Sequence, residues 1–325
     1  MYRVPELHNC IVLSEEEVQS YLWGIGWNAM INRIAETFTE EALGNTVSPP
    51  KVIVDIPEYK NDFRMMPSRM LKYPDFCGAK IISACTPCPS KFNLPLARGI
   101  YILNDSETQS VLLMFDSNLT TAYRTAAASA VAVRVLSKAG ASTLGIIGCG
   151  QQAEFHIKAI SAVRNIKRTL VYDINETCTT KLCERLNPVW NLKPSTKGQI
   201  LNECDIVVTL TPTYEPHIFQ GDIPDKDMVI CAVGGDSEKK RELHHSILQF
   251  TDNFCDSLAQ VSHTGTIVDA NKSKAYYRLN SLGNLMIGKC VYSNHRRVKI
   301  FLSTGVALED LALGIMLYER VRDKI

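Results

Sequence analysis

The chain has 325 residues, 46% of them hydrophobic, and its 35 Lys and Arg nearly balance 34 Asp and Glu, for a formal charge of +1. Disorder needs low hydrophobicity and high net charge, so this composition excludes a disordered chain. Near-neutrality also argues against a nucleic-acid partner, because nucleic-acid-binding surfaces are usually basic. The length predicts about two domains, at roughly 150 residues each.

The cysteines and the N-terminus bear on the cellular compartment. Eleven cysteines, odd in number and irregularly spaced, do not resemble a disulfide scaffold. The N-terminal segment MYRVPELHNC lacks the basic-then-apolar pattern of a signal peptide. No apolar run approaches the ~18 residues that a transmembrane helix needs. We therefore expect a cytoplasmic protein with no membrane partner.

The first third of the chain predicts a helix followed by a sheet. Residues 14–44 show apolar residues at helical spacing, Ser14 and Glu17 fit a capping box, and Gly44 is a plausible stop. Short β-like runs follow without intervening helices, which indicates an antiparallel or mixed sheet. These runs are residues 51–56, 80–85, 97–105 and 110–116.

A different pattern begins near residue 120, where we place a domain boundary. An alanine-rich helix over residues 121–139 leads into apolar strands that alternate with helical or polar segments, at residues 144–147, 167–173, 205–213 and 227–236. Strands that alternate with helices predict a parallel sheet with right-handed crossovers. A last helix, within residues 305–321, is expected to rejoin the first domain.

A glycine loop opens the parallel part. Residues 148–153 read Gly-Cys-Gly-Gln-Gln-Ala, a G-x-G-x-x-A fingerprint between a strand and a helix. Gly148 would make the tight turn, Gly150 would let the backbone approach a pyrophosphate, and Ala153 would let helix and strand pack. The helix start at Gln151 and Gln152 offers unpaired N–H groups to the phosphate. A glycine turn that only packs is the plainer alternative.

An acidic residue follows the second predicted strand. Asp173 lies 23 residues beyond Gly150, at the end of the run LVYD. A carboxylate there can accept hydrogen bonds from the ribose hydroxyls and would repel the 2′-phosphate of NADP. We therefore predict NAD as the cofactor.

Four motifs together resemble the ornithine cyclodeaminase/μ-crystallin family. They are TAYRTAAASAVA (121–132), GCGQQA (148–153), VGGDSEKKREL (233–243) and STGVALEDLAL (303–313). The resemblance implies an α/β fold: an α+β substrate-binding and dimerisation domain (1–120, with the helix 306–325) and a Rossmann NAD-binding domain (121–305). It also implies a homodimer and NAD-dependent hydride transfer at the α-carbon of an amino or imino acid.

The resemblance assigns roles to particular side chains. The substrate carboxylate would meet basic residues, and Lys80 and Asp236 would be catalytic, with Asp236 accepting the amine proton and stabilising the iminium. Lys80 would activate water if a hydrolysis step follows. The implied substrate-binding residues are Lys51, Arg64, Met66, Lys80 and Arg124. Further cofactor contacts are expected at Thr125, Thr209, Thr211, Val233, Gly234, Ser303 and Gly305.

The reaction within the family is the open question. Ornithine cyclodeaminases usually carry a glutamate where this chain has Arg64, and a cation there suits a second substrate carboxylate. The segments RGIYILND and TAYRTAAASA resemble the branch that oxidises N-(2-amino-2-carboxyethyl)-L-glutamate to release 2,3-diaminopropionate. We thus favour oxidation of an amino acid or an amino-acid conjugate. Cyclodeamination of ornithine, ketimine reduction and a role for Arg69 stay open.

Two other classes of protein compete with this interpretation. Cys85 and Cys88 form a C-x-x-C pair, but no second pair at a compatible spacing completes a zinc site. A non-catalytic binding protein, like the crystallins of the family, is disfavoured because Lys80 and Asp236 are both present.

Overall fold

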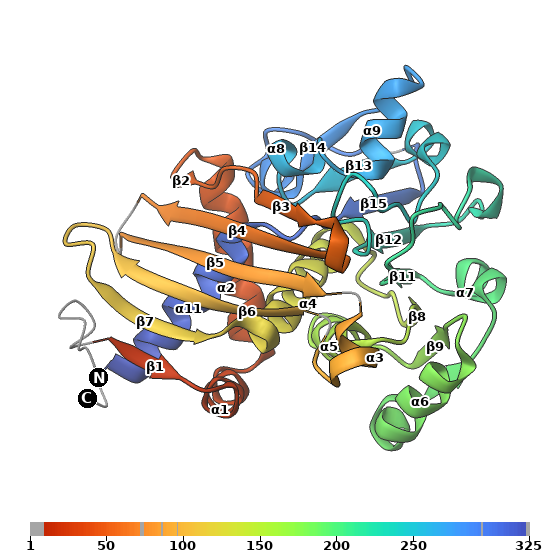
Figure 1. Cartoon of the computed structure of the whole chain (residues 1–325). Coiled ribbons are helices and arrows are strands. Elements are labelled where there is room, and N and C mark those ends of the chain that lie inside the picture. The colour runs from red at the N-terminus through yellow and green to blue at the C-terminus, as the bar shows by residue number, and fades with distance from the viewer. Residues whose placement is uncertain (1–9, 72–74, 86, 96, 294, 323–325) are drawn as a thin grey trace. The chain divides into compact units, whose positions relative to one another are not determined.

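The computed structural model describes residues 10–71, 75–85, 87–95, 97–293 and 295–322 (Figure 1). These residues divide into two compact units. The first contains the described residues up to Arg124 and those from Val306 onward, and the second is Thr125–Gly305. Helix α4 (Ser117–Leu136) begins in the first unit and ends in the second. No helix in the described part of the chain has the length and apolar character to cross a membrane.

The first unit is built on a mixed sheet, which confirms the predicted α+β character. Its strand order is β1-β7-β6-β5-β4-β2, with β3 also paired to β4. Among the described strand pairs of this sheet, only β1–β7 is parallel. The strands are β1 (Ile11–Leu13), β2 (Thr46–Val47), β3 (Val52–Ile56), β4 (Asn61–Met70), β5 (Phe76–Cys85), β6 (Ala97–Asp105) and β7 (Val111–Asp116).

Strand β4 was not predicted, because its sequence, NDFRMMPSRM, lacks an apolar run. Its pairing partners β3 and β5 supply the hydrogen bonds that hold it extended. Two short helical segments border this part of the sheet, η2 (Pro57–Tyr59) and α3 (Cys88–Phe92). A disulfide joins Cys85, the last residue of β5, to Cys88 at the start of α3.

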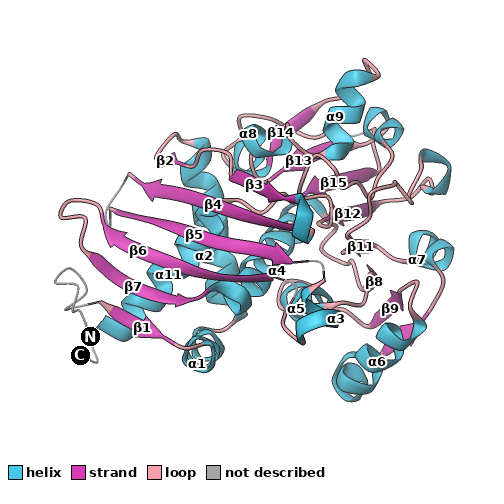
Figure 2. Ribbon diagram, in the orientation of Figure 1, coloured by secondary structure: helices cyan, strands magenta, loops and turns pink. Residues whose placement is uncertain are grey.

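Helices cover one face of this sheet (Figure 2). They are α1 (Glu15–Ile25), α2 (Trp27–Ala42) and α11 (Ala307–Val321), and α11 packs on β4, β5, β6 and α2. The capping box of Ser14 and Glu17 is confirmed. The single helix expected over residues 14–44 is wrong, because Gly26 adopts a φ of 77° and separates α1 from α2.

The pairing register sorts the strand residues onto the two faces. Met66, Lys80 and Tyr101 lie directly opposite one another on β4, β5 and β6, so their side chains share a face. All three are buried, so this is the face that α11 covers. Their sequence neighbours point the other way, because side chains alternate along a strand. The next row on that outer face is Val52, Met65, Ile81 and Ile100.

The second unit is a parallel sheet with helices, which confirms the predicted Rossmann-type fold. Its order is β10-β9-β8-β11-β12-β15-β13-β14, and every described pair is parallel. The strand order reverses between β8 and β11, which is where α/β proteins bind their ligands. The strands are β8 (Thr143–Ile147), β9 (Arg168–Tyr172), β10 (Leu192–Pro194), β11 (Ile206–Thr209), β12 (Met228–Ala232), β13 (Asp252–Cys255), β14 (Leu279–Ser281) and β15 (Val298–Leu302).

Helices and short 3-10 segments connect these strands. The α-helices are α5 (Gln151–Ser161), α6 (Glu176–Trp190), α7 (Lys197–Glu203), α8 (Leu258–Val261), α9 (Gly265–Lys272) and α10 (Leu282–Met286), and the 3-10 segments are η3 (Gln220–Asp222) and η4 (His245–Gln249). The core lies where these elements meet the sheet, around fully buried residues such as Val207, Ile230 and Ile300.

Candidate functional site

Four buried charged side chains meet beneath the sheet of the first unit. Lys80 comes from β5 and Arg124 from α4, while Glu309 and Asp310 lie in the first turn of α11. The Nζ of Lys80 donates to Oδ1 of Asp310 at 3.1 Å. The guanidinium of Arg124 lies 2.7 Å from Oε2 of Glu309, through Nη1, and 3.3 Å from Oδ1 of Asp310, through Nε. Asp310 therefore links the two cations.

Burial dominates the electrostatics of this cluster. The side chain of Lys80 is 1% exposed, and desolvation lowers its pKa to about 8, with the nearby Arg124 acting in the same direction. Asp310 and Glu309 oppose that shift because their negative charges favour the ammonium. Burial also raises the pKa of the neighbouring Tyr101 well above its ordinary value, so this phenol stays neutral. Lys80 is thus able to exchange a proton near neutral pH.

The other predicted substrate residues are placed differently. Met66 is buried opposite Lys80 in the sheet register. Arg64 lies two residues before it, and its Nε and Nη2 donate to the Asp62 carboxylate at 2.8 and 2.7 Å. Lys51 is half-buried in the segment just before β3.

The basic residues expected to meet the substrate carboxylate are paired with acids that the sequence analysis did not name. Lys80 and Arg124 do come together, but Glu309 and Asp310 neutralise them. Asp62 likewise pairs with Arg64. Arg69, whose role stayed open, forms an exposed ion pair with Asp75 at 2.6 Å. A residue-type count over scattered segments could not reveal these carboxylate partners.

The glycine loop follows β8 in the second unit. Gly148 has a φ of 102°, and a Cβ there would lie 2.9 Å from the carbonyl oxygen of Leu210, so the turn requires glycine. Gly150 caps α5 without a side-chain hydrogen bond, and a Cβ on it would meet no described atom within 4 Å. Packing therefore does not explain Gly150. Open space above a helix start is what a pyrophosphate needs.

The next residues continue the same surface. Gln151 is exposed, whereas Oε1 of Gln152 is buried and has no hydrogen-bond partner among the described residues. Ala153 is fully buried. Asp173 follows β9, and its two carboxylate oxygens accept hydrogen bonds from the backbone N–H of Cys149 at 2.7 Å and of Asn175 at 2.8 Å. A carboxylate has about four lone-pair sites, so Asp173 can still accept bonds from ribose hydroxyls.

A buried carboxylate, Glu242, organises the loops after β11 and β12. It accepts hydrogen bonds from the hydroxyls of Thr209 and Thr211 at 2.7 and 2.6 Å, and from the backbone N–H of Thr211 and Gly234 at 2.6 and 2.7 Å. A Cβ on Gly234 would lie 2.0 Å from the Thr211 carbonyl oxygen. These residues thus build the loops, and Val233 continues the framework by donating its N–H to the Thr209 carbonyl.

A second buried carboxylate, Asp256, organises the segment after β15. It accepts hydrogen bonds from the backbone N–H of Thr304 and Gly305 at 2.5 and 2.9 Å, and from the Thr304 hydroxyl at 2.7 Å. Gly305 has a φ of 69°. Burial raises the pKa of both Asp256 and Glu242, while their hydrogen bonds act against that shift. Asp256 thereby positions the backbone of Thr304 and Gly305, while Ser303 donates its N–H to the Ala232 carbonyl. Ser303 and Thr125, at the start of this unit, are also buried.

The predicted catalytic acid Asp236 belongs to the second unit. It follows β12, at the carboxyl end of the parallel strands, and its side chain is 29% exposed. Nζ of Lys240 donates to Asp236 Oδ1 at 2.9 Å. Asp236 thus lies on the edge of the sheet that carries the glycine loop and Asp173.

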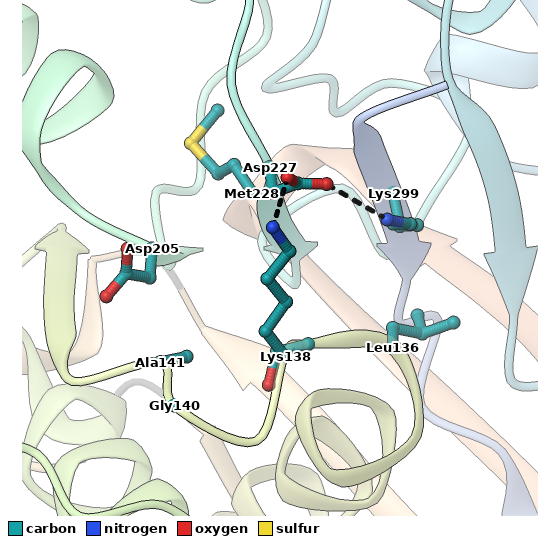
Figure 3. Close-up of a pocket in the computed structure, with 9 residues that line it drawn as sticks. Leu136, Lys138, Gly140, Ala141, Asp205, Asp227, Met228 and Lys299 are labelled. Atoms are coloured by element: carbon teal, nitrogen blue, oxygen red, sulfur yellow. Dashed lines mark ion pairs between the residues drawn. The ribbon is translucent and has the colours of Figure 1, made fainter. Parts of the chain in front are cut away.

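A pocket of about 250 Å³ lies on the opposite edge of that sheet, at the amino ends of the strands (Figure 3). Asp227 lies between Lys138 and Lys299, at 2.5 and 3.8 Å from their ammonium groups (Figure 3). None of the predicted site residues lines this pocket. Its position excludes it as the nucleotide site, because Rossmann folds bind at the carboxyl ends.

The C-x-x-C pair that was weighed as half of a zinc site forms the Cys85–Cys88 disulfide. Within the residues that the structure describes, no three His, Cys, Asp or Glu side chains gather as metal ligands would.

Sequence reasoning missed four buried carboxylates, two in each unit. Glu309 and Asp310 stand within the motif STGVALEDLAL, and Glu242 stands within VGGDSEKKREL. The signal for the first pair was available: two acidic residues in an otherwise apolar helix are costly to bury unless cations meet them. Asp256 follows the buried strand β13, which was not predicted.

Comparisons with known proteins agree with this geometry. A family model for the ornithine cyclodeaminase/mu-crystallin family matches residues 10–325. Alanine dehydrogenase of Archaeoglobus fulgidus is 31% identical over 322 residues, covering 97% of this chain and 96% of that protein. A solved archaeal alanine dehydrogenase dimer with bound NAD has a TM-score of 0.88 and 29% identity, covering 97% of each chain.

A second solved structure is equally similar in fold. It is the Δ1-pyrroline-2-carboxylate reductase of Thermococcus litoralis, in complex with NADH and L-proline. The TM-score is 0.89 at 26% identity, covering 97% of this chain and 98% of that one. The fingerprint, the doubly wound sheet and the match over nearly the whole chain have the same explanation: the chain belongs to the ornithine cyclodeaminase/mu-crystallin family.

Proposed function

We propose that the chain is an NAD-dependent oxidoreductase acting on the Cα–N bond of an amino acid or amino-acid conjugate. One observation carries the proposal: this member of the family has both a buried cluster with Lys80 and Arg124 and a glycine loop, beside Asp173, with free space at Gly150. The loop suits a dinucleotide, and the cations suit a carboxylate. Similar proteins are an alanine dehydrogenase with NAD and an imine reductase with NADH and L-proline.

The cofactor assignment rests on the loop itself. Gly150 leaves room at the start of α5, where the helix N–H groups and the partial positive charge favour a pyrophosphate. Asp173 favours ribose hydroxyls over a 2′-phosphate, which supports NAD rather than NADP. NAD, when bound, supplies a nicotinamide that takes or gives a hydride.

Three side chains would carry the substrate chemistry. Arg124 presents a guanidinium that binds a carboxylate in a charge-assisted way. Asp236 accepts a proton of the substrate ammonium, which frees the nitrogen lone pair. Its side chain is 29% exposed, so it can release that proton to water, and the carboxylate then stabilises the iminium. Lys80, with a pKa of about 8, can donate or accept a proton, including that of a water molecule that hydrolyses the imine.

The assay follows both cofactor and product. Purified protein is incubated with NAD+ and a panel of amino acids and conjugates, or with NADH and the corresponding imines, while NADH absorbance and product mass are recorded. We expect stoichiometric NADH change and product, lost in Lys80→Met and Asp236→Asn. Arg69→Gln, which breaks an exposed ion pair away from the cluster, is the matched control and should retain activity.

Two results would redirect the assignment. Conversion of ornithine to proline and ammonia without net NADH would identify a cyclodeaminase. Binding of NADH without turnover of any amino acid, imine or conjugate would indicate a binding protein instead.

We further propose a homodimer that forms through the outer face of the mixed sheet. The row Val52, Met65, Ile81 and Ile100 makes that face apolar, and three of these side chains are 57%, 43% and 41% exposed (Val52, Met65 and Ile100). In Figure 2, no described helix of this unit covers β4, β5 and β6 on that side. Exposed apolar patches of this kind mark interfaces, and a solved relative is a dimer.

Light scattering tests the dimer. Ile100→Glu should convert the protein to a monomer, because a buried unpaired charge is expensive at an interface. Val291→Glu is the matched control, since Val291 is 85% exposed and lies outside the sheet. A wild-type monomer, or a dimer unaffected by Ile100→Glu, would contradict the proposal.

A further inference from the structure

The two adjacent acids at the start of α11 differ in the cation that lies nearest to each, although Asp310 also lies 3.3 Å from Arg124 Nε. Oε2 of Glu309 accepts a hydrogen bond from Arg124 Nη1 at 2.7 Å, while Oδ1 of Asp310 accepts one from Lys80 Nζ at 3.1 Å. Both acids are at most 1% exposed, in a helix whose remaining buried residues are apolar. Buried carboxylates persist only where cations or donors compensate their desolvation. Their positions are therefore tied to Lys80 and Arg124.

We propose that Glu309 and Asp310 are positioning residues with separate tasks: Glu309 fixes Arg124 for the substrate carboxylate, and Asp310 fixes Lys80 for proton transfer. This inference rests on the function proposed above. Neither acid is a catalytic residue in this scheme, because each acts through the cation that it holds. The two tasks are separable because each acid has its own shortest contact.

Asp310 affects both the position of the Lys80 ammonium and its pKa. The hydrogen bond fixes the ammonium beneath the sheet, and the negative charge favours the protonated form against burial. The charged groups that act on Lys80 in the described part of the chain are Asp310 and Glu309 from α11 and Arg124 from α4. Tyr101 on β6 lies beside Lys80 in the register, but it stays neutral and so does not replace the charge of Asp310.

Glu309 acts mainly on Arg124. A carboxylate 2.7 Å from Nη1 orients the planar guanidinium, which leaves its other N–H groups in fixed directions. The influence of Glu309 on the pKa of Lys80 is the weakest among the contributing groups. Loss of Glu309 should thus impair substrate binding more than proton transfer.

The test compares two isosteric variants, Asp310→Asn and Glu309→Gln, by full pH profiles of kcat and KM in the NADH assay. In Asp310→Asn, the limb of the kcat profile that lies near pH 8 in the wild type should move to lower pH by about one unit or more, because an opposite charge beside Lys80 has been removed. In Glu309→Gln that limb should move less, and KM should rise about tenfold, the effect of weakening one charge-assisted hydrogen bond.

Each outcome has one meaning. A wild type without turnover refutes the proposed function, whereas an active wild type whose pH limb is unmoved in Asp310→Asn refutes the positioning role. Equal effects of the two variants on KM and on the pH limb would refute separate tasks. If Asp310→Asn does not fold, the double variant with Lys80→Met is made. Recovery of folded protein supports the Lys80–Asp310 pair. An unfolded double variant, when Lys80→Met alone folds, overturns it.

Discussion

Replacement of Lys80 by arginine should change how the stability of the first unit depends on pH. The Lys80 ammonium is buried, so its pKa falls from 10.5 to about 8 on folding. Between these two values the unfolded chain binds more protons than the folded chain, and stability therefore rises with pH across that window. At 1.36 kcal/mol per pKa unit, the full rise is on the order of 3 kcal/mol. Arginine does not titrate in this range, so Lys80→Arg should lack the rise.

The measurement must isolate the first unit, because two-unit proteins need not unfold in one step. Trp190 lies in α6 of the second unit, whereas Trp23 lies in α1 of the first and Trp27 stacks there on Tyr123 at 4.8 Å. In a Trp190→Phe background, tryptophan fluorescence during urea unfolding therefore reports the first unit alone. In that background, the free energy of unfolding is measured with lysine at this position and with the Lys80→Arg substitution, from pH 7 to about 10.5. Parallel curves for the two proteins would refute a pKa lowered by burial.

Three further predictions concern the second unit. Asp173→Ala should weaken NADH binding about tenfold and reduce the discrimination against NADPH, as measured by fluorescence titration, because a hydrogen-bonding carboxylate is lost; unchanged discrimination would contradict the ribose role. Gly150→Ala should fold with unchanged stability and bind NADH less tightly, as measured by calorimetry. Gly145→Ala should instead unfold at a lower urea concentration, since its Cβ would lie 2.3 Å from Ile200. Glu242→Ala should destabilise the unit by about 3 kcal/mol or more, because four donors lose their acceptor, and a smaller loss in urea unfolding would count against its organising role.

The local hydrophobic pattern of the sequence predicted those helices and strands in which most residues are buried. The strand around Leu144 and the helix that contains Arg124 are continuous apolar or alanine-rich runs, and both were predicted correctly. Strand β4 was not, because only alternate residues such as Met66 and Ser68 face the core while their neighbours are exposed. The break at Gly26 was missed because a single glycine within a helical pattern is often tolerated. Such features depend on tertiary partners rather than on local periodicity.

The site shows the same division between local and tertiary information. The glycine loop and Asp173 belong to one βαβ unit, so spacing alone placed them side by side, and Asp173 does bond to the loop at Cys149. Lys80 and Asp310 are 230 residues apart, and no spacing relates them. The basic residues in scattered segments were therefore predicted without the acids that pair with them.

The two acids beside Lys80 and Arg124 bear on which substrates the proposed site would accept. With two cations and two carboxylates, the cluster around Lys80 is neutral when every member is charged. A substrate that brought only a negative charge would leave an uncompensated charge in a buried place, which is costly. A zwitterionic amino acid, or an imino acid whose nitrogen is protonated, brings no net charge. If the cluster binds the substrate carboxylate as proposed, its charge balance favours substrates that carry a cationic nitrogen next to that carboxylate over simple 2-oxo acids.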